Sequence, residues 1–532
     1  MESPAADFVF LGGRVFTGTG WSNGLAVRGD RVVALGATAT RDLLGPSTRR
    51  VDLAGGMALP GFHDAHTHLL GGALAEECLD TSGVRSPEEL AARVAGWIEK
   101  RGAAGWIHGR GWDSDAFPGR RLPTRAHLDA VAPNTPVLLR RRDGHAALAN
   151  SSALDAAGVG PGTPDPPGGR FLRDAEGRPT GLLLEEPAID RVARLLPPPT
   201  QDDCERALAR VLRRAASLGI TSLQDDPSHD ARLPAARAYA ALYRRGELPA
   251  RVCVWRRLGR PLASLRAEET ELARLGVPAQ HLRFGLLKGY LDGSLGSRTA
   301  LLFSPYADAP DTAGVDLDPV DRLEPLAREA ATAGYSVGLH AIGDRAVARA
   351  LEILAGCPRT SGQALRVEHA ELFRPQDVAR VQAGDVVASV QPIHLASDAE
   401  ILTERLGNAR ARWAFPLRSL LRSGAALAFG TDYPVEGLDP LPGLACAVAR
   451  RPPNTAAAFV PEEALTLEEA LHAYTRGSAA AAGLGPEFGR LEPGAFADVA
   501  VLDTDLGAIP PEEWARVRCV LTLRGGEVVH EG

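Results

Sequence analysis

The central part of the chain alternates short apolar runs with longer amphipathic stretches. The apolar runs have the length of buried strands, whereas most intervals between them are rich in Ala, Leu and Arg at helical spacing. Strands are predicted at eight positions: 58–68, 219–225, 251–257, 283–291, 335–341, 365–370, 386–392 and 426–432. Helices are predicted between them, for example at 202–218, 229–246, 320–333 and 344–356.

A strand–helix alternation repeated eight times is typical of the α/β class and of a parallel (β/α)8 TIM barrel. We therefore predict such a barrel over residues 58–484. The interval between the first two strands is too long for one helix, and it contains the Pro- and Gly-rich tract GPGTPDPPGGRF. Residues 105–200 are thus predicted to form an inserted subdomain near the mouth of the barrel.

Both ends of the chain show alternation of apolar and polar residues with a period of two. DFVFLGGRVFTG and GLAVRGDRVVALG stand near the start, and ADVAVLDTD and VRCVLTLRGGEVVHEG stand near the end. This pattern with Gly-containing turns indicates antiparallel strands. We predict one β-sandwich domain assembled from residues 1–57 and 485–532.

Composition bears on which partners and which cellular compartment are expected for the protein. The 532 residues are 45% hydrophobic and carry a formal charge of −7, which argues against nucleic-acid binding. No apolar run approaches the roughly 20 residues that span a bilayer. The six cysteines form no CxxC pair, and the first residues lack a signal-peptide pattern. A cytoplasmic protein without a membrane partner is expected.

Lysine occurs only at Lys100 and Lys288, although Lys and Arg together number 59. Lys100 stands in a polar helical stretch, but Lys288 stands inside the apolar run RFGLLKGYLDGS, where a buried charge costs free energy unless it has a function. A desolvated lysine can lose its proton, whereas arginine stays charged. A neutral lysine amine can take up carbon dioxide and form a carbamate that bridges two metal ions.

Metal-ligating residue types end several of the predicted strands, and the strands of a barrel place such residues at one common end. Alternation along the first strand puts Asp64, His66 and His68 on the inward face and directs His63 toward the surrounding helices. The predicted ligands of a divalent metal centre are His66, His68, Lys288, His340, His369 and Asp432. Imidazole and carboxylate ligands suit zinc, and this set suffices for two Zn²⁺ ions, or for one.

Each of these residues, taken alone, also has a structural interpretation. The histidine pair could pack or cap, His340 and His369 could be core residues, and Asp432 could begin a turn. Their concurrence at the ends of different strands favours the metal centre. Asp432 is then also the predicted catalytic base, which takes a proton from the attacking water.

Several segments resemble the amidohydrolase superfamily, specifically the amidohydrolase-3 group that includes YtcJ-like proteins and N-substituted formamide deformylases. The matching segments include LPGFHDAHTHL (59–69), LKGYLDGSLGSRTALL (287–302), LHAIGDRAV (339–347), RVEHAELF (366–373), SVQPIHLASD (389–398), GTDYPV (430–435) and LEPGAFADVAVLD (491–503). The resemblance implies a metal-dependent barrel with a β-sandwich from both chain ends. It also implies that His66, His68 and Asp432 hold one ion, that His340 and His369 hold a second, and that carboxylated Lys288 bridges them.

Candidate substrate contacts are predicted at the barrel mouth and in the insert. They are Trp112, His145, Asp292, Arg298, Gln391 and His394, with Asp113, Asn150 and Ser294 as weaker candidates. Trp112 is equally consistent with the core of the insert, and Asp292 and Arg298 with a Gly-rich turn. Asp344 is consistent with a helix cap.

The expected activity is metal-dependent hydrolysis of a non-peptide carbon–nitrogen bond, in an amide or an N-substituted formamide, by a metal-activated hydroxide. Deamination or hydrolysis of a cyclic amide or imide on the same scaffold is the alternative. A non-catalytic relative is a third interpretation, against which the competent residues at all six ligand positions argue. The expected partner is a small amide-type molecule, and a homo-oligomer is consistent with the resemblance.

Overall fold

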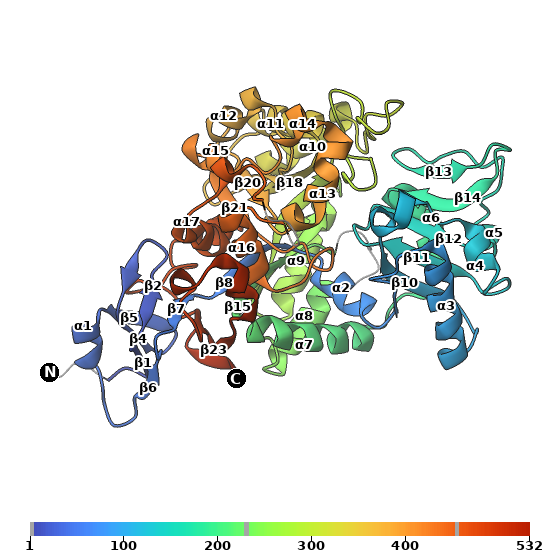
Figure 1. Cartoon of the computed structure of the whole chain (residues 1–532). Coiled ribbons are helices and arrows are strands. Elements are labelled where there is room, and N and C mark those ends of the chain that lie inside the picture. The colour runs from blue at the N-terminus through green and yellow to red at the C-terminus, as the bar shows by residue number, and fades with distance from the viewer. Residues whose placement is uncertain (1–4, 228–233, 453–456) are drawn as a thin grey trace.

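The computed structural model describes residues 5–227, 234–452 and 457–532. The first residues of the helix predicted over 229–246 therefore lie outside the described residues, and α8 is described over Ala235–Arg244. Within the described ranges the principal strands form four sheets (Figure 1). None of the described helices is both long and apolar enough to cross a membrane.

A curled parallel sheet, here called the barrel sheet, forms the centre of the molecule. Its strands in the described chain follow the order β21-β20-β19-β18-β17-β16-β15-β8. Their bounds are β8 Phe62–Thr67, β15 Ile220–Asp225, β16 Arg251–Arg257, β17 Leu282–Tyr290, β18 Val337–Ala341, β19 Leu365–His369, β20 Val387–Val390 and β21 Ala426–Phe429. The predicted (β/α)8 barrel is thereby confirmed, with a strand at each of the eight predicted positions.

The first predicted strand, 58–68, is divided in the structure. Residues Met57–Pro60 form β7, which pairs with a strand of the C-terminal segment, and β8 begins at Phe62. The chain passes between the two sheets at Gly61, where a Cβ atom would lie 2.2 Å from the side chain of Thr221. Apolar periodicity alone does not show such a change of sheet, because both halves of the segment are buried.

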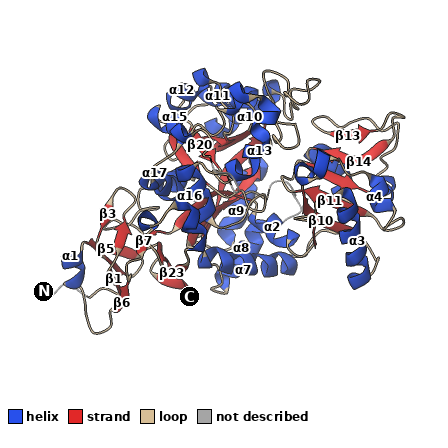
Figure 2. Cartoon of the chain, in the orientation of Figure 1, coloured by secondary structure: helices blue, strands red, loops and turns tan. Residues whose placement is uncertain are grey.

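Helices cover the outside of the barrel sheet (Figure 2). They include α2 Leu69–Ala75, α7 Gln201–Ser217, α9 Leu262–Arg274, α10 Val320–Thr332, α11 Asp344–Ala355, α12 Pro375–Ala383, α13 His394–Leu406, α15 Leu417–Arg422 and α16 Pro440–Ala449. Helix α7 illustrates why they form. Thr200 and Asp203 make a capping box at its start, and Cys204, Leu208 and Val211 recur at helical spacing on its buried face. The apolar faces join the strands in one continuous core.

Strands from both chain ends build the β-sandwich, as predicted. In the described residues one sheet has the order β5-β4-β1-β6 and the other β24-β23-β22-β7-β2-β3. The bounds are β1 Phe8–Leu11, β2 Arg14–Phe16, β3 Trp21–Ser22, β4 Leu25–Arg28, β5 Arg31–Leu35, β6 Arg49–Asp52, β22 Val499–Leu502, β23 Cys519–Arg524 and β24 Glu527–Glu531. Phe10, Val27, Val499 and Leu523 are among the residues of its core. The first described residues and the C-terminus lie at this end of the molecule (Figure 1).

The insert after the first barrel strand contains a sheet of its own, with the order β13-β14-β12-β11-β10-β9 in the described chain. Its elements are β9 Leu79–Asp80, α3 Pro87–Arg101, β10 Ile107–Trp112, α4 Arg125–Asp129, β11 Val137–Arg141, β12 Ala146–Ala149, α5 Ser151–Ala156, β13 Arg170–Arg173, β14 Pro179–Leu184 and α6 Glu186–Ala193. The insert sheet thus begins well before residue 105, and α3 packs on it through Leu90 and Val94. In Figure 1 the insert lies across the barrel from the sandwich.

Candidate metal centre

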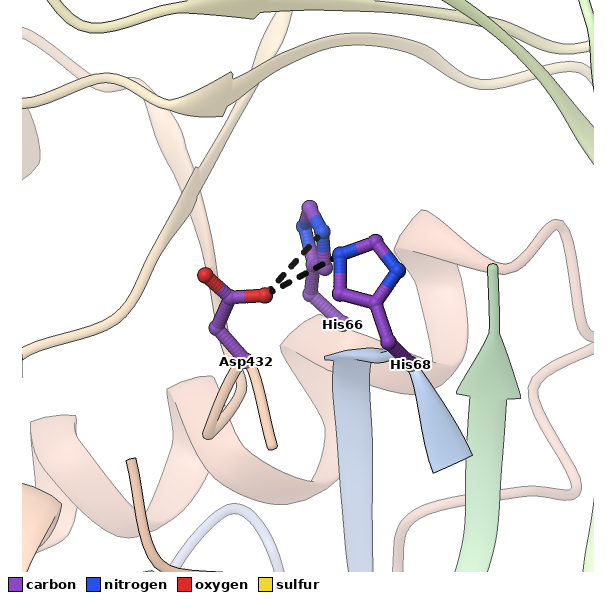
Figure 3. A group of neighbouring side chains, drawn as sticks. All are labelled: His66, His68 and Asp432. Atoms are coloured by element: carbon purple, nitrogen blue, oxygen red, sulfur yellow. Dashed lines mark ion pairs between the residues drawn. The ribbon is translucent and has the colours of Figure 1, made fainter. Parts of the chain in front are cut away.

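Three candidate ligands converge where β8 meets the segment that follows β21. The backbone N–H of Asp432 donates to the carbonyl of His66 at 2.8 Å, and that of His68 donates to Tyr433 at 2.7 Å. These bonds bring the side chains of His66, His68 and Asp432 face to face (Figure 3). Oδ1 of Asp432 lies 3.3 Å from Nε2 of His68 and 3.7 Å from Nε2 of His66. Ligands at zinc-to-nitrogen distance in a tetrahedron are about 3.4 Å apart, so the spacing fits a shared ion.

The far nitrogen of each histidine is held by an acceptor. Nδ1 of His66 lies 2.9 Å from Oε2 of Glu368, and Nδ1 of His68 lies 2.8 Å from the carbonyl oxygen of Asp226. Because Nδ1–H donates in both rings, Nε2 keeps its lone pair and faces Asp432. A histidine fixed in this way is the usual arrangement of a metal ligand.

The charge states of these groups also suit a cation. Burial, together with nearby Lys288, lowers the pKa of His66 to about 4. Burial would raise the pKa of Asp432, but His68, His66 and His369 outweigh it and hold the pKa of this carboxyl well below its usual range. At neutral pH the site therefore offers an uncharged imidazole and an ionised carboxylate, which are the forms that bind divalent metal ions.

The amine of Lys288 lies next to His66, and its role as a metal ligand stays a prediction. Its side chain is 1% exposed, and Nζ lies 2.9 Å from Nε2 of His66 and 3.1 Å from Oδ2 of Asp226. Asp226 follows β15 and also accepts a hydrogen bond from the hydroxyl of Tyr290 at 2.9 Å. Asp226 was not among the predicted site residues, although two aspartates at the end of a buried strand (LQDD) are a visible signal.

His340 and His369 complete the predicted set. Their ring centroids are 4.4 Å apart, and the ring of His369 is 4.8 Å from that of His66. Burial lowers the pKa of both imidazoles well below the ordinary value. Nδ1 of His369 is buried and has no hydrogen-bond partner in the described part of the chain, as expected for an atom reserved for a metal. Nε2 of His340 faces the carbonyl oxygen of Gly293 at 3.3 Å.

His394, predicted as a substrate contact, lies closer to the candidate ligands than the sequence suggested. Ligand atoms of His369, His394 and Asp432 all lie within 4.8 Å of one another. Nδ1 of His394 lies 3.2 Å from Oε1 of Glu371, and Nε2 lies 3.6 Å from Oδ2 of Asp432. Burial lowers the pKa of His394, but Glu371 outweighs this effect and raises it to about 9. The two oxygens of Asp432 thus face different histidines.

Backbone strain marks two candidate ligands. His369 has φ 70° and Asp432 has φ 57°, both in the left-handed region that residues other than glycine rarely adopt. Such conformations cost on the order of 1–3 kcal/mol each and concentrate at functional sites. Hydrogen bonds from Ala370 N–H to Ala341 and from Asp432 N–H to His66 hold the strained segments.

The insert and the barrel line one pocket above these residues. His145 and Asp113 come from the insert, and Ser294, His394 and Asp432 come from the barrel. The ring of His145 lies 5.3 Å from that of His340, and its Nδ1 lies 2.8 Å from Oε2 of buried Glu185. Burial lowers the pKa of His145, but Glu185 outweighs it and raises the value to about 9.

Two other residues predicted as substrate contacts, Trp112 and Asn150, contribute to the packing and capping of the insert. Trp112 is 1% exposed in the core of the insert, where its Nε1 donates to the carbonyl of Leu139, so the alternative interpretation holds. Asn150 caps α5 through Ala153 N–H.

The loop after β17 also differs from prediction. The carboxylate of Asp292 accepts hydrogen bonds from the N–H groups of Leu301, Ile342 and Gly343, which tie this loop to the end of β18. Burial raises the pKa of Asp292 to about 8. Arg298 pairs with Asp308 rather than pointing into the pocket.

Gln391 is fully buried after β20, and neither amide atom has a hydrogen-bond partner within the described residues. Its role as a substrate contact stays a prediction. Asp344 is the first residue of α11, but the N-cap is Gly343 and no side chain caps this helix. Oδ1 of Asp344 instead accepts a hydrogen bond from Phe303 N–H, so the helix-cap interpretation is wrong.

The predicted orientation of His63 is wrong. Its Nε2 lies 3.3 Å from Nε2 of Gln224, whose Oε1 accepts a hydrogen bond from Arg366 inside the barrel. The pairing of β8 with β15 shifts register twice, between Ile220 and Ser222 and between Leu223 and Asp225. These irregularities interrupt the alternation on which the prediction depended. Asp64 binds Thr431 and the N–H of His66, so it helps to orient this ligand.

Arg366 and Glu368, both fully buried on β19, were not predicted from the sequence. Burial would raise the pKa of Glu368, but Arg366 and His66 outweigh it and hold the value at about 2. LRVEHA carries the same signal as the segment around Lys288, because it too has charged residues inside an apolar strand.

A parallel barrel whose strands present histidines and an aspartate to a common pocket at their carboxyl ends defines a metal-dependent barrel hydrolase. The Amidohydrolase family model matches residues 49–530. The chain therefore belongs to the amidohydrolase family, as the resemblance predicted.

Individual relatives agree with this assignment. The putative amidohydrolase YtcJ of Bacillus subtilis is 33% identical over 91% of each chain. The N-substituted formamide deformylase of Arthrobacter pascens is 28% identical over 90% of this chain and 89% of its own. The crystal structure of an uncharacterized metal-dependent hydrolase from Pyrococcus horikoshii is similar with a TM-score of 0.73 and 30% identity, over 95% of this chain and 99% of that chain.

Proposed function

We propose that the protein hydrolyses a non-peptide carbon–nitrogen bond in a small amide-type substrate, most specifically an N-substituted formamide, with the help of bound divalent metal. The observation that carries the proposal is the convergence of His66, His68 and Asp432 at zinc-ligand spacing. Similarity to an N-substituted formamide deformylase over most of both chains supports the substrate class.

The residues fit a metal centre of two ions. His66, His68 and Asp432 would hold one ion, His340 and His369 would hold the other, and Lys288, as its carbamate, would be a further ligand. The ions, when bound, supply a Lewis acid for the substrate carbonyl and lower the pKa of water. Formation of the carbamate requires Lys288 to give up its proton, and Asp226 at 3.1 Å is placed to receive it.

The chain's own residues perform the proton transfers. Asp432, held ionised by the surrounding histidines, accepts a proton from the attacking water and delivers it to the leaving nitrogen. His394 contacts Oδ2 of Asp432, and His145 lines the same pocket from the insert, so both are placed to orient the substrate. Burial of the site keeps bulk water away from these charges.

Metal analysis combined with substrate profiling tests the proposal. Purified protein is assayed for zinc and other divalent metals and is offered N-substituted formamides, acyl amines and cyclic amides. We expect bound metal, and formate and amine released in equal amounts from a formamide. A chelator should abolish this activity and Zn²⁺ should restore it.

Other outcomes would contradict the proposal. Release of ammonia alone would indicate a deaminase, and ring opening without release of a second product would indicate a cyclic amide hydrolase. Hydrolysis that persists in metal-free protein would show that the reaction does not depend on a metal ion.

A further inference from the structure

A buried ion pair on β19 leads directly to one candidate ligand. Arg366 and Glu368 are both fully buried, and Nε of Arg366 lies 2.7 Å from Oε1 of Glu368. Nη2 of Arg366 donates to Oε2 of Glu368 at 2.9 Å, and the same oxygen accepts from Nδ1 of His66 at 2.9 Å. A continuous chain of contacts therefore runs from the guanidinium to the imidazole that faces Asp432.

The guanidinium of Arg366 is fixed by acceptors from several elements. Nη1 donates to Oε1 of Gln224 at 2.8 Å and to the carbonyl of Ala481 at 3.2 Å. Nη2 donates to the carbonyl of Ala65 at 3.0 Å and to the hydroxyl of Ser389 at 2.8 Å. These acceptors lie on β8, β15, β20 and α18 (Ser478–Ala481). Because they surround the guanidinium, Arg366 can hold Glu368 in only one place.

Such a pair is not explained by stability alone. Taking two charges out of water costs free energy, and well-packed apolar residues of similar volume often serve stability as well or better. A carboxylate on the far nitrogen of a ligating histidine, by contrast, fixes the ring and makes the metal-binding nitrogen more basic. The geometry at His66 has this form.

We propose that Glu368, held by Arg366, is a positioning residue that sets the affinity of the His66–His68–Asp432 group for its divalent ion. The inference rests on the proposed function, since it presupposes that an ion binds there. Glu368 acts through His66 and has no need to touch the substrate.

Zinc affinity, rather than activity, provides the test. Chelator-treated wild-type protein and the Glu368→Gln variant are titrated with Zn²⁺ in competition with a chromophoric chelator. We expect the variant to bind the ion about 10–100-fold more weakly, which is the usual cost of losing such a partner. The number of ions bound at saturation should not change.

Two further variants make the test specific. Glu368→Asp keeps the charge opposite Arg366 but withdraws the carboxylate from His66, so its affinity should lie between those of the other two proteins. Glu463→Gln replaces another buried glutamate, whose side chain binds the N–H and the hydroxyl of Ser419 instead of a candidate ligand. This variant should bind zinc as the wild type does.

The outcomes separate this inference from the proposed function. If the wild type takes up no metal, the proposed function fails. If the wild type binds zinc and Glu368→Gln matches its dissociation constant within about twofold, only the positioning role is overturned. Should Glu368→Gln not fold by circular dichroism, Glu368→Asp decides, and a wild-type affinity in that variant overturns the inference.

Discussion

At the scale of single residues, the site depends on which protonation states burial permits. Burial lowers the pKa of His340 and His369 far below that of free histidine, so these rings stay neutral and retain a lone pair. Asp432 stays ionised because histidines surround it. The amine of Lys288 lies within 3.1 Å of both Oδ2 of Asp226 and Nε2 of His66.

Replacing Lys288 by arginine tests the carbamate. The Lys288→Arg variant would keep a positive charge beside Asp226, but a guanidinium does not form a carbamate and stays protonated. We expect this variant to lose the second ion and to reduce kcat/KM by roughly 100-fold or more, as befits the loss of several kcal/mol of charge stabilisation. Metal stoichiometry and formamide turnover are the measurements. Near-normal metal stoichiometry and turnover would contradict the carbamate at Lys288. The Lys100→Arg variant, changed at an exposed position, is the control for a lysine-to-arginine substitution.

Asp432→Asn separates proton transfer from folding. The amide has nearly the same shape as the carboxylate but cannot take up a proton, so we expect kcat to fall about 10²–10⁴-fold, the range for general acid–base groups. Circular dichroism and the urea midpoint should change little by comparison. An unchanged rate constant would show that another residue is the base, and His394 would be the next to examine.

At the scale of elements, ion pairs join the insert to the barrel mouth. Arg405 of α13 is fully buried and pairs with Asp115 of the insert and with Asp308 of the loop after β17. Arg141 at the end of β11 pairs with Asp113, Asp115 and Asp143, and Asp143 also accepts from Ser294 of the barrel. Charged contacts therefore link the insert to the barrel beside the pocket.

Arg405→Met tests this connection. The substitution leaves two carboxylates with fewer partners in a poorly hydrated place, which should lower the free energy of unfolding by about 3 kcal/mol. Arg412→Met is the control, because Arg412 and its partner Glu462 are both more than half exposed and such pairs contribute about 0–1 kcal/mol. Urea denaturation measures the free energy of unfolding of both variants. Equal decreases would show that the buried ion pairs of Arg405 contribute no more stability than an exposed pair.

At the scale of the whole molecule, buried titratable groups of opposite effect set the response to acid. Burial lowers the pKa of His63 to about 3, but it raises that of Asp64 to about 7. Below about pH 6.5 the unfolded chain protonates His63 while the folded chain does not, so acid destabilises the fold through this residue. Asp64 has the opposite effect, because between about pH 7 and 4 the folded chain protonates this residue while the unfolded chain does not, so acid stabilises the fold through it. The dependence of the free energy of unfolding on pH is the sum of such opposing contributions.

Comparison with His63→Leu isolates one contribution. Above about pH 6.5 both proteins have an uncharged side chain at this position in either state. Between about pH 7.5 and 4.5 the metal-free wild type should lose about 3 kcal/mol relative to the variant, at about 1.4 kcal/mol for each pH unit below 6.5. Urea midpoints of both proteins across this range measure the difference. A difference that does not change with pH would contradict the buried neutral imidazole.

Local patterns in the chain were enough to locate the barrel strands, the sandwich from both chain ends and the chemical types of the six candidate ligands. Periodicity and composition carry this information, because a buried strand must be apolar and a charge within it is conspicuous. The orientation of His63 was not available in this way, since register shifts between β8 and β15 interrupt the alternation.

Which side chains meet became known only from the folded arrangement. Glu368 reaches His66 and Asp226 reaches Lys288 across strands far apart in the chain, and His145 enters the pocket from the insert. Trp112 instead lies in a core that the insert forms for itself. Partners of this kind depend on strand order, stagger and packing, which no local pattern encodes, because each is set by how distant segments of the chain fold together.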